Sequence, residues 1–207
     1  MLKIEHLTKI YGEKKAVDDL SLDIRPGEIY GFIGHNGAGK TTTIKACCGI
    51  LQYDSGEIEV DGLSIREHPL ECKKMIAYIP DNPDLYEFMT GIQYLNFVSD
   101  IFPSFRILPA CRLYTRHEFI QKLLIMDEPF VGLDPKASHL LKLMMRELCD
   151  NGSAIFFSTH VLEVAEKLCD KVAIIKGGRL VRSGTMDEVK GDISLEDVFL
   201  ELEGEEC

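Results

Sequence analysis

The pattern of apolar and polar residues predicts strands early in the chain. Apolar and polar positions alternate up to Ile24, and the short apolar run Ile29–Ile33 follows after a Pro-Gly turn. A further strand is predicted over Glu57–Val60, before the hairpin sequence Asp61-Gly62. The segment Lys40–Leu51 is predicted to form a helix. This part of the chain is therefore expected to be rich in strands, with one helix among them.

Strands and helices alternate more clearly later in the chain. Strands are predicted at Met75–Ile79, Leu123–Met126, Ala154–Ser158, Val172–Lys176 and Arg179–Arg182, and helices at Pro135–Cys149 and Val161–Cys169. This alternation favours a mostly parallel α/β sheet with flanking helices, with antiparallel strands added at either end.

The sequence Gly34-His-Asn-Gly-Ala-Gly-Lys-Thr41 lies between a predicted strand and a predicted helix. This order is the one in which the motif G-x-x-x-x-G-K-[ST] forms a phosphate-binding loop. The glycines let backbone N–H groups surround phosphate oxygens, and the helix directs its positive end toward the same anion. Lys40 would bind the outer phosphates and Thr41 would supply a hydroxyl to Mg²⁺. The sequence therefore predicts a nucleoside triphosphate site, and a ligand-free glycine turn is the alternative.

Two carboxylates follow the apolar run Leu123–Met126 directly. Such a run is typical of a strand buried on both faces, and its carboxyl end is where α/β sheets bind ligands. We expect Asp127 to hold Mg²⁺ and Glu128 to act as general base toward the attacking water. A helix cap or a solvated loop is the alternative for two acids at this place.

Composition limits the range of partners. The net charge is −11, and residues 187–207 hold nine acids and one base. This balance argues against nucleic-acid binding. The apolar runs are too short to span a membrane and the start lacks a signal-peptide pattern, so a cytoplasmic location is expected. The seven cysteines show no metal-binding spacing, and reduced thiols are expected.

The combined motifs carry a family resemblance. The segment Asp127-Glu-Pro-Phe-Val-Gly-Leu-Asp-Pro135, followed by Ser158-Thr-His160, is similar to the nucleotide-binding subunits of ATP-binding cassette (ABC) transporters. The resemblance covers Met1–Ile101 and Leu123–Leu202. It implies an α/β P-loop NTPase of ABC type, with a mostly parallel sheet, flanking helices and an antiparallel β subdomain.

The resemblance also implies roles for single residues. His160 corresponds to the histidine that links the γ-phosphate to the catalytic glutamate, so the implied catalytic residues are Glu128, His160 and Lys40. Tyr11 would stack on adenine, although core packing is the alternative, and Val17 would line the other side of the base. Asp134 would organise the site across a dimer interface, and it is also a good helix N-cap before a proline. The implied nucleotide-binding set is Tyr11, Val17, Asn36, Gly37, Ala38, Gly39, Lys40, Thr41, Thr42, Asp81 and Asp134, and the implied Mg²⁺ ligands are Thr41, Asp127 and Asp81.

The chain departs from the family pattern in two places. Asp81 stands where the family usually has glutamine, which keeps an oxygen ligand but adds charge and shortens the reach. The second departure is that no Leu-Ser-Gly-Gly-Gln-like signature is found between Thr90 and Lys122, and only 87 positions separate Lys40 from Asp127. The helical subdomain is therefore expected to be truncated or absent. A divergent surface loop, a deletion with altered joining sequence, or an omission of residues from the sequence would each explain this.

The expected organisation is a single ABC ATP-binding domain over residues 1–207. Its parts are the β subdomain with the phosphate loop (1–90), an atypical helical region (91–122), the core that follows it (123–186) and an acidic C-terminal helix or tail (187–207). The ending Ser194-Leu-Glu-Asp-Val-Phe-Leu200 resembles exporter ATPases whose permeases are separate proteins, and its apolar residues have helical spacing.

Three functions remain open at this stage. The first is an ATP-hydrolysing subunit that drives export through separate transmembrane permease subunits, paired with a second nucleotide-binding subunit at the cytoplasmic face of the membrane. The resemblance places the permease contact in Ile76–Met89. The second is a regulatory module that binds ATP without efficient hydrolysis, because the signature is missing. The third is a non-transport ABC ATPase, which lacks supporting basic patches here.

Overall fold

The computed structural model describes residues 1–82, 93 and 122–204 of the 207-residue chain. The chain divides into two compact units, Met1–Asp81 with Gln121–Cys207, and Asn82–Ile120. The strands and helices with assigned bounds belong to the first unit. Apart from residues 93 and 122, the predicted helical region at 91–122 lies outside the described residues, and so do residues 83–89 of the segment expected to contact a permease.

Within the described residues, one sheet has four strands in the order β2-β1-β4-β5, and neighbouring strands in it run antiparallel. We call it the antiparallel sheet. Its strands are β1 (Leu2–Tyr11), β2 (Lys14–Ile24), β4 (Ser55–Val60) and β5 (Leu63–Ser64). The turn at Asp61-Gly62 joins β4 to β5, as the sequence predicts.

The second sheet, called the main sheet, has six strands in the order β10-β9-β3-β8-β7-β6 among the described residues. Its strands are β3 (Ile29–Ile33), β6 (Ile76–Ile79), β7 (Leu123–Met126), β8 (Ala154–Thr159), β9 (Lys171–Lys176) and β10 (Arg179–Thr185). All neighbours run parallel except β9 and β10. A mostly parallel sheet with an antiparallel subdomain confirms the predicted fold class.

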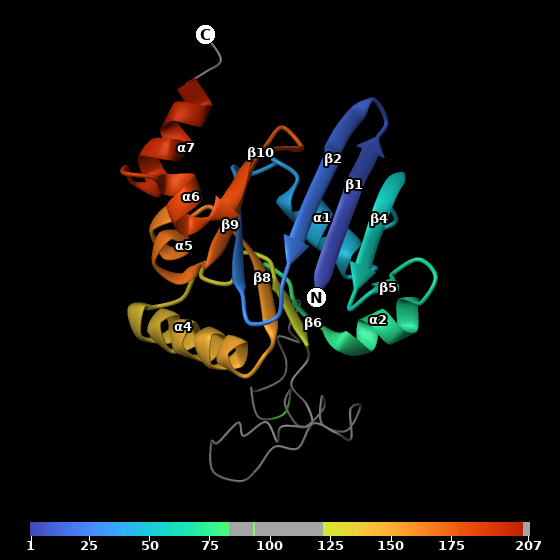
Figure 1. Cartoon of the computed structure of the whole chain (residues 1–207), viewed down its shortest axis with the longest axis horizontal. Helices are drawn as coiled ribbons and strands as arrows, with labels where there is room; N and C mark the ends of the chain where they lie inside the picture. The colour runs from blue at the N-terminus through green and yellow to red at the C-terminus, as the bar shows by residue number, and fades with distance from the viewer. Residues whose placement is uncertain (83–92, 94–121, 205–207) are drawn as a thin grey trace. The chain divides into compact units, whose positions relative to one another are not determined.

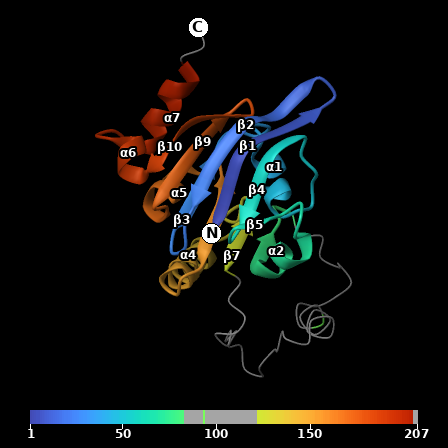
Figure 2. The same cartoon turned by 45° about the vertical axis from the view of Figure 1, so that its right-hand side comes forward.

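Helices cover both faces of the main sheet (Figures 1 and 2). They are α1 (Lys40–Cys47), α2 (Pro69–Met75), α4 (Pro135–Asp150), α5 (Leu162–Leu168), α6 (Met186–Lys190) and α7 (Leu195–Gly204). The core has two parts: α1 packs between the antiparallel sheet and one face of the main sheet, and α4, α5, α6 and α7 pack on the other face. Phe156 points into the first part and Phe157 into the second, as expected for a strand buried on both faces.

Most predicted bounds lie within three residues of the observed ones, and the largest difference is at the end of the first helix. β3 and β7 have the predicted limits, and α7 forms where the apolar spacing predicts a helix. The helix predicted over Lys40–Leu51 ends at Cys47 instead. Gly49 adopts a left-handed conformation with φ of 63°, and its N–H donates to the Ala46 carbonyl. A glycine in this conformation is a common helix terminator.

The described cysteines are free thiols, and all of them are buried: Cys47, Cys48, Cys72, Cys149 and Cys169. Within the described part of the chain, no helix combines the length and the apolar character that crossing a membrane requires.

Candidate nucleotide site

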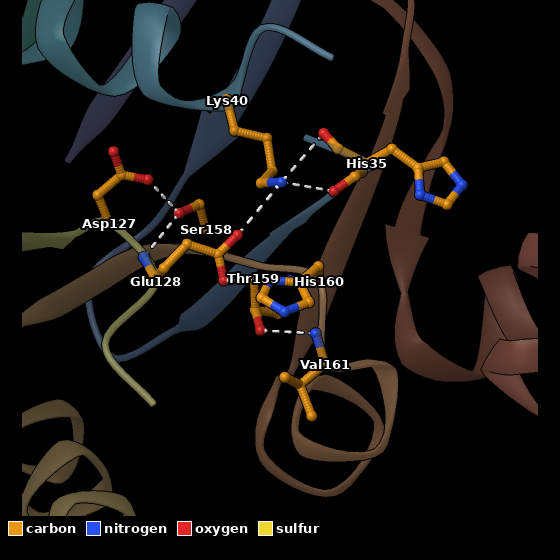
Figure 3. Close-up of polar contacts among 9 residues, drawn as sticks. His35, Lys40, Asp127, Glu128, Ser158, Thr159, His160 and Val161 are labelled. Carbon is orange, nitrogen blue, oxygen red and sulfur yellow. Dashed lines mark hydrogen bonds and ion pairs between the residues drawn. The ribbon is translucent and has the colours of Figure 1, made fainter. Parts of the chain in front are cut away.

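The register of the main sheet brings three loops from distant parts of the sequence to one edge. Ile33 of β3 pairs with Thr159 of β8, and Met126 of β7 pairs with Phe157. Because these strands are parallel, the residues that follow them leave the sheet at the same edge. The phosphate loop after β3, the two acids after β7 and His160 after β8 therefore lie close together, as Figure 3 shows.

The phosphate loop rests on the first residues of β2 and on the turn between β9 and β10. Gly39 has φ of 111°, and a Cβ there would meet the Ala16 carbonyl oxygen at 2.4 Å. The loop also receives a hydrogen bond of 2.9 Å from the Gly178 N–H to the Ala38 carbonyl. At the start of α1, the Thr43 hydroxyl donates to the Gly39 carbonyl at 3.0 Å. The loop is thus held from outside, and glycine is required where Ala16 approaches.

Lys40 is buried and folds back on its own loop. Its Nζ donates to the carbonyl oxygens of Gly34 at 2.5 Å and His35 at 3.2 Å. The same ammonium lies 3.2 Å from Glu128 Oε1. Lys40 therefore has a carboxylate and two carbonyls around it, which are ligands that phosphate oxygens can replace.

Glu128 connects the lysine to His160. Its Oε2 lies 2.9 Å from His160 Nδ1 and accepts a longer bond of 3.3 Å from the His160 N–H. Glu128 has φ of 50°, a left-handed conformation that costs a non-glycine residue about 1–3 kcal/mol. The Glu128 N–H donates to the Ser158 hydroxyl at 2.9 Å, which holds this conformation. The strained backbone directs the carboxylate toward Lys40 and His160 (Figure 3).

Asp127 is fully buried and only half satisfied. Its Oδ1 accepts a hydrogen bond of 2.5 Å from the Ser158 hydroxyl, whereas its buried Oδ2 has no hydrogen-bond partner. Burial raises the pKa of Tyr78 to about 12, and the negative charges of Asp127 and Asp81 add to this shift. Burial and the charge of Asp127 also raise the pKa of Cys48 to about 12. Asp127 and Asp81, the two predicted carboxylate ligands of Mg²⁺, therefore both contribute to the raised pKa of Tyr78.

No group of three or more His, Cys, Asp or Glu side chains that could hold a metal ion occurs among residues 1–82, 93 and 122–204. Asp127 and Asp81, together with Thr41, could supply part of an oxygen ligand set. Mg²⁺ usually takes one or two carboxylates, and substrate phosphates complete its coordination. The unpartnered Oδ2 of Asp127 fits such a partial set.

The two residues predicted to contact adenine differ sharply in exposure. Tyr11, at the end of β1, is 50% exposed, and Lys9 Nζ lies 5.1 Å from the centre of its ring. Val17 is fully buried in the core. In this structure only Tyr11 has a face available to a base, and Val17 offers no surface that could line the other side.

The remaining predicted residues lie in two places. Asn36 and Gly37 are exposed in the phosphate loop, and Thr41 and Thr42 are half-buried in the first turn of α1. Asp134 is the N-cap of α4, since its Oδ1 accepts a hydrogen bond of 2.8 Å from the Ala137 N–H. The alternative of a helix cap is therefore realised for Asp134.

Sequence reasoning assigned no role to Ser158, although it binds both Asp127 and Glu128. The available signal was a polar residue at the carboxyl end of a buried strand. Ala16 was also missed, because its contribution is a backbone carbonyl and leaves no trace in the side-chain pattern.

The strand, phosphate loop and helix, together with a strand that ends in two acids, define a nucleotide-binding P-loop ATPase. A family model described as "ABC transporter" matches residues 17–102. The chain is 31% identical to the ABC-type transporter ATP-binding protein EcsA of Bacillus subtilis, over 100% of this chain and 98% of that protein. The chain therefore belongs to the family of ABC transporter ATP-binding proteins.

Two further similarities agree with this membership. The chain is 31% identical to the Nod factor export ATP-binding protein I of Ralstonia nicotianae, over 91% of this chain and 68% of that protein. A solved structure of an ATP-binding subunit of an ABC transporter matches with a TM-score of 0.82 and 29% identity, over 98% of this chain and 99% of that chain. Members of this family bind and hydrolyse ATP.

Proposed function

We propose that this chain hydrolyses ATP with Glu128 as the general base. The observation that carries the proposal is the position of the Glu128 carboxylate between Lys40 Nζ, at 3.2 Å, and His160 Nδ1, at 2.9 Å. A carboxylate bound to a lysine and a histidine at the mouth of a phosphate loop is placed to accept a proton from water beside the γ-phosphate.

The arrangement suggests an order of events. The phosphates of ATP would replace the carbonyls of Gly34 and His35 as partners of the Lys40 ammonium. The ion pair between Lys40 and Glu128 would loosen at the same time, which would free the carboxylate to bind the attacking water. His160 would keep Glu128 oriented and would carry the second contact to the γ-phosphate.

Mg²⁺ would be held by Thr41, Asp127 and Asp81. The fit rests on the buried Asp127 Oδ2, which has no hydrogen-bond partner, and on the fixed orientation that Ser158 gives to the other oxygen. When bound, the ion would neutralise charge on the phosphates. The carboxylate of Asp127 would orient the Mg²⁺ ion, and the hydrogen bond from Ser158 would prevent this carboxylate from rotating.

The proposed cellular role is export through separate transmembrane permease subunits. A relative that is named for Nod factor export supports this direction. The subunit would act with a second nucleotide-binding subunit, with Asp134 near their interface, on the cytoplasmic face of the membrane. The domain organisation proposed here is a single ABC domain, and no nucleic-acid partner is proposed.

A second candidate function is ATP binding without efficient hydrolysis. The alignment with EcsA extends over 242 positions, whereas this chain has 207 residues. At least about 35 positions of that alignment therefore have no residue in this chain. Such a gap agrees with a missing signature segment, which would leave one side of the nucleotide without partners.

The ATPase rate of the Glu128→Gln variant tests the main proposal. Glutamine keeps the size of the side chain but cannot accept the proton, so the rate should fall about 100-fold or more while ATP still binds. Glu163→Gln is the matched control, because Glu163 is exposed on α5 and forms an ion pair with Lys167 on the same helix. If Glu128→Gln hydrolyses ATP as fast as the wild type, the assignment of Glu128 is contradicted. If both proteins bind ATP and neither hydrolyses it, the second function is favoured.

A further inference from the structure

The C-terminal helix α7 touches the phosphate loop through an aromatic pair. The ring of Phe199 lies edge-on to the ring of His35, with centroids 4.8 Å apart and an interplanar angle of 63°. His35 occupies a variable position of the phosphate-loop motif, for which the sequence gives no role. In Figures 1 and 2, α7 lies beside β9, which is the strand next to β3 in the main sheet. The end of the chain is thus in contact with the loop that should hold the phosphates.

A second connection joins the same helix to the same loop. Lys176, at the end of β9, donates from its Nζ to the Leu202 carbonyl of α7 at 3.0 Å. The turn that follows β9 carries Gly178, whose N–H donates to the Ala38 carbonyl of the phosphate loop at 2.9 Å. His35 and Lys176 also line one shallow pocket, together with Asn36, Gly37, Ala38, Ile175 and Gly177. Helix α7 therefore contacts the phosphate loop directly at His35, and it is connected to Ala38 through Lys176 and the turn that follows β9.

The backbone of His35 is bound to Lys40. While the His35 ring contacts Phe199, the His35 carbonyl accepts a hydrogen bond of 3.2 Å from Lys40 Nζ. A change in the position of His35 would therefore change the environment of Lys40. Phe199 thus contacts the His35 ring, and the His35 carbonyl binds Lys40 Nζ.

We propose that Phe199 is a positioning residue of the nucleotide site, which acts through His35 to hold the phosphate loop in the conformation that accepts ATP. The proposal rests on the function above, in which Gly34–Thr41 binds the phosphates. It gives the C-terminal helix a part in nucleotide affinity.

A purely structural role for Phe199 is the competing explanation. Phe199 belongs to the core on the outer face of the main sheet, with Leu195 and Val198 from the same helix. Loss of its ring could therefore weaken the docking of α7 without any effect on the loop. Val198 separates the two explanations, because it is buried in the same core, whereas the ring contact with His35 belongs to Phe199.

The experiment measures the affinity of the full chain for ATP with Mg²⁺ by titration calorimetry. The variants are Phe199→Leu, His35→Ala and the double variant. Leucine keeps apolar bulk but removes the ring contact. Each single variant should weaken ATP binding about three- to tenfold, the size of an edge-to-face aromatic contact. The double variant should lose no more ATP affinity than the single variant that binds ATP more weakly, because both changes break the same contact.

Two controls and a second readout complete the design. Val198→Ala should lower the melting temperature while it keeps ATP affinity within twofold of wild type, and Leu200→Ala, at an exposed position of α7, should change neither. Amide hydrogen exchange in residues 34–39 of the nucleotide-free protein should be faster in Phe199→Leu than in Val198→Ala.

The proposal is overturned if Phe199→Leu binds ATP as wild type does, if Val198→Ala weakens ATP binding as much as Phe199→Leu, or if the two single effects add in full. Lys40→Ala identifies failure of the proposed function instead. If Lys40→Ala binds ATP normally, the phosphate loop is not the site. If Lys40→Ala loses ATP and the Phe199 and His35 variants keep it, only the role of Phe199 is wrong.

Discussion

The main sheet and the antiparallel sheet contribute to the nucleotide site in different ways. In the main sheet, β3, β7 and β8 run parallel and end at one edge, so residues as distant as Lys40 and His160 meet there. In the antiparallel sheet neighbouring strands end at opposite edges. Its contributions are the exposed ring of Tyr11 and the Ala16 carbonyl behind Gly39. The parallel strands thus bring Lys40, Glu128 and His160 together, while the antiparallel sheet supports the phosphate loop and leaves the ring of Tyr11 exposed.

The largest expected effect tests the support that the antiparallel sheet gives. Gly39→Ala would place a Cβ at 2.4 Å from the Ala16 carbonyl oxygen, at φ of 111°. We expect the free energy of unfolding to fall by about 2–4 kcal/mol, with loss of ATP binding, measured by urea denaturation and calorimetry. Gly37→Ala is the matched control, since φ is 81° there but the space is open. Equal losses in both variants would show that Ala16 does not support the loop.

The next effect concerns the main sheet. Ser158→Ala removes the hydroxyl that binds Asp127 Oδ1 and the Glu128 N–H. Two groups would lose their partner, so we expect the free energy of unfolding to fall by about 1–3 kcal/mol, and ATP hydrolysis to fall with it. Ser183→Ala, at an exposed position of β10, should change neither quantity. A Ser158→Ala enzyme with normal stability and turnover would refute the role given to this serine.

Tyr11→Ala separates contacts to the base from contacts to the phosphates. Stacking of a base on an aromatic ring contributes about 1–3 kcal/mol, so the affinity for ATP should fall about tenfold. Affinity for inorganic tripolyphosphate should not change, and Tyr11→Phe should bind ATP as wild type does. An equal loss for both ligands would mean that Tyr11 acts on the phosphate loop instead of on adenine.

The smallest effect is expected at Asp18, whose ion pair with Arg179 joins the two sheets. Asp18 of β2 binds Lys15 at 2.8 Å and Arg179 of β10 at 2.7 Å, and the hydrogen bond from Lys15, followed by that from Arg179, holds the pKa of Asp18 below its usual range. Its contribution to stability is therefore present above about pH 4, the usual range for aspartate, and is lost as the pH falls through the lowered value. Asp18→Asn should lower the melting temperature slightly at pH 7, and the difference from wild type should shrink as the pH falls below about 4. A difference that persists unchanged at pH 3 would contradict this origin.

The sequence predicts those features of the site that depend on residues adjacent in the chain. The apolar run Leu123–Met126 and the acids after it gave β7 its bounds, and Asp134 before Pro135 marked the start of α4. The helix that the sequence predicts over Lys40–Leu51 is too long, because the pattern of apolar residues does not show the left-handed turn at Gly49. Helix α2 was not predicted, since its short sequence carries little helical periodicity.

The contacts that depend on tertiary structure could not be predicted. Ser158 reaches Asp127 only because β7 and β8 are neighbours in register, and Ala16 reaches Gly39 only because the two sheets pack together. The return of Lys40 to the Gly34 carbonyl and to Glu128 is a property of the folded loop. Spacing in the sequence contains no information on such pairs.

The most direct test of the central claim is a crystal structure of the full chain with Mg²⁺ and a non-hydrolysable ATP analogue. The account predicts that Lys40 leaves the Gly34 carbonyl and Glu128 and binds the outer phosphates. It also predicts that the Asp127 carboxylate faces the metal ion and that Glu128, still bound to His160, faces the γ-phosphate. A structure in which Lys40 keeps its present partners, or in which the analogue lies away from residues 34–41, would contradict the account.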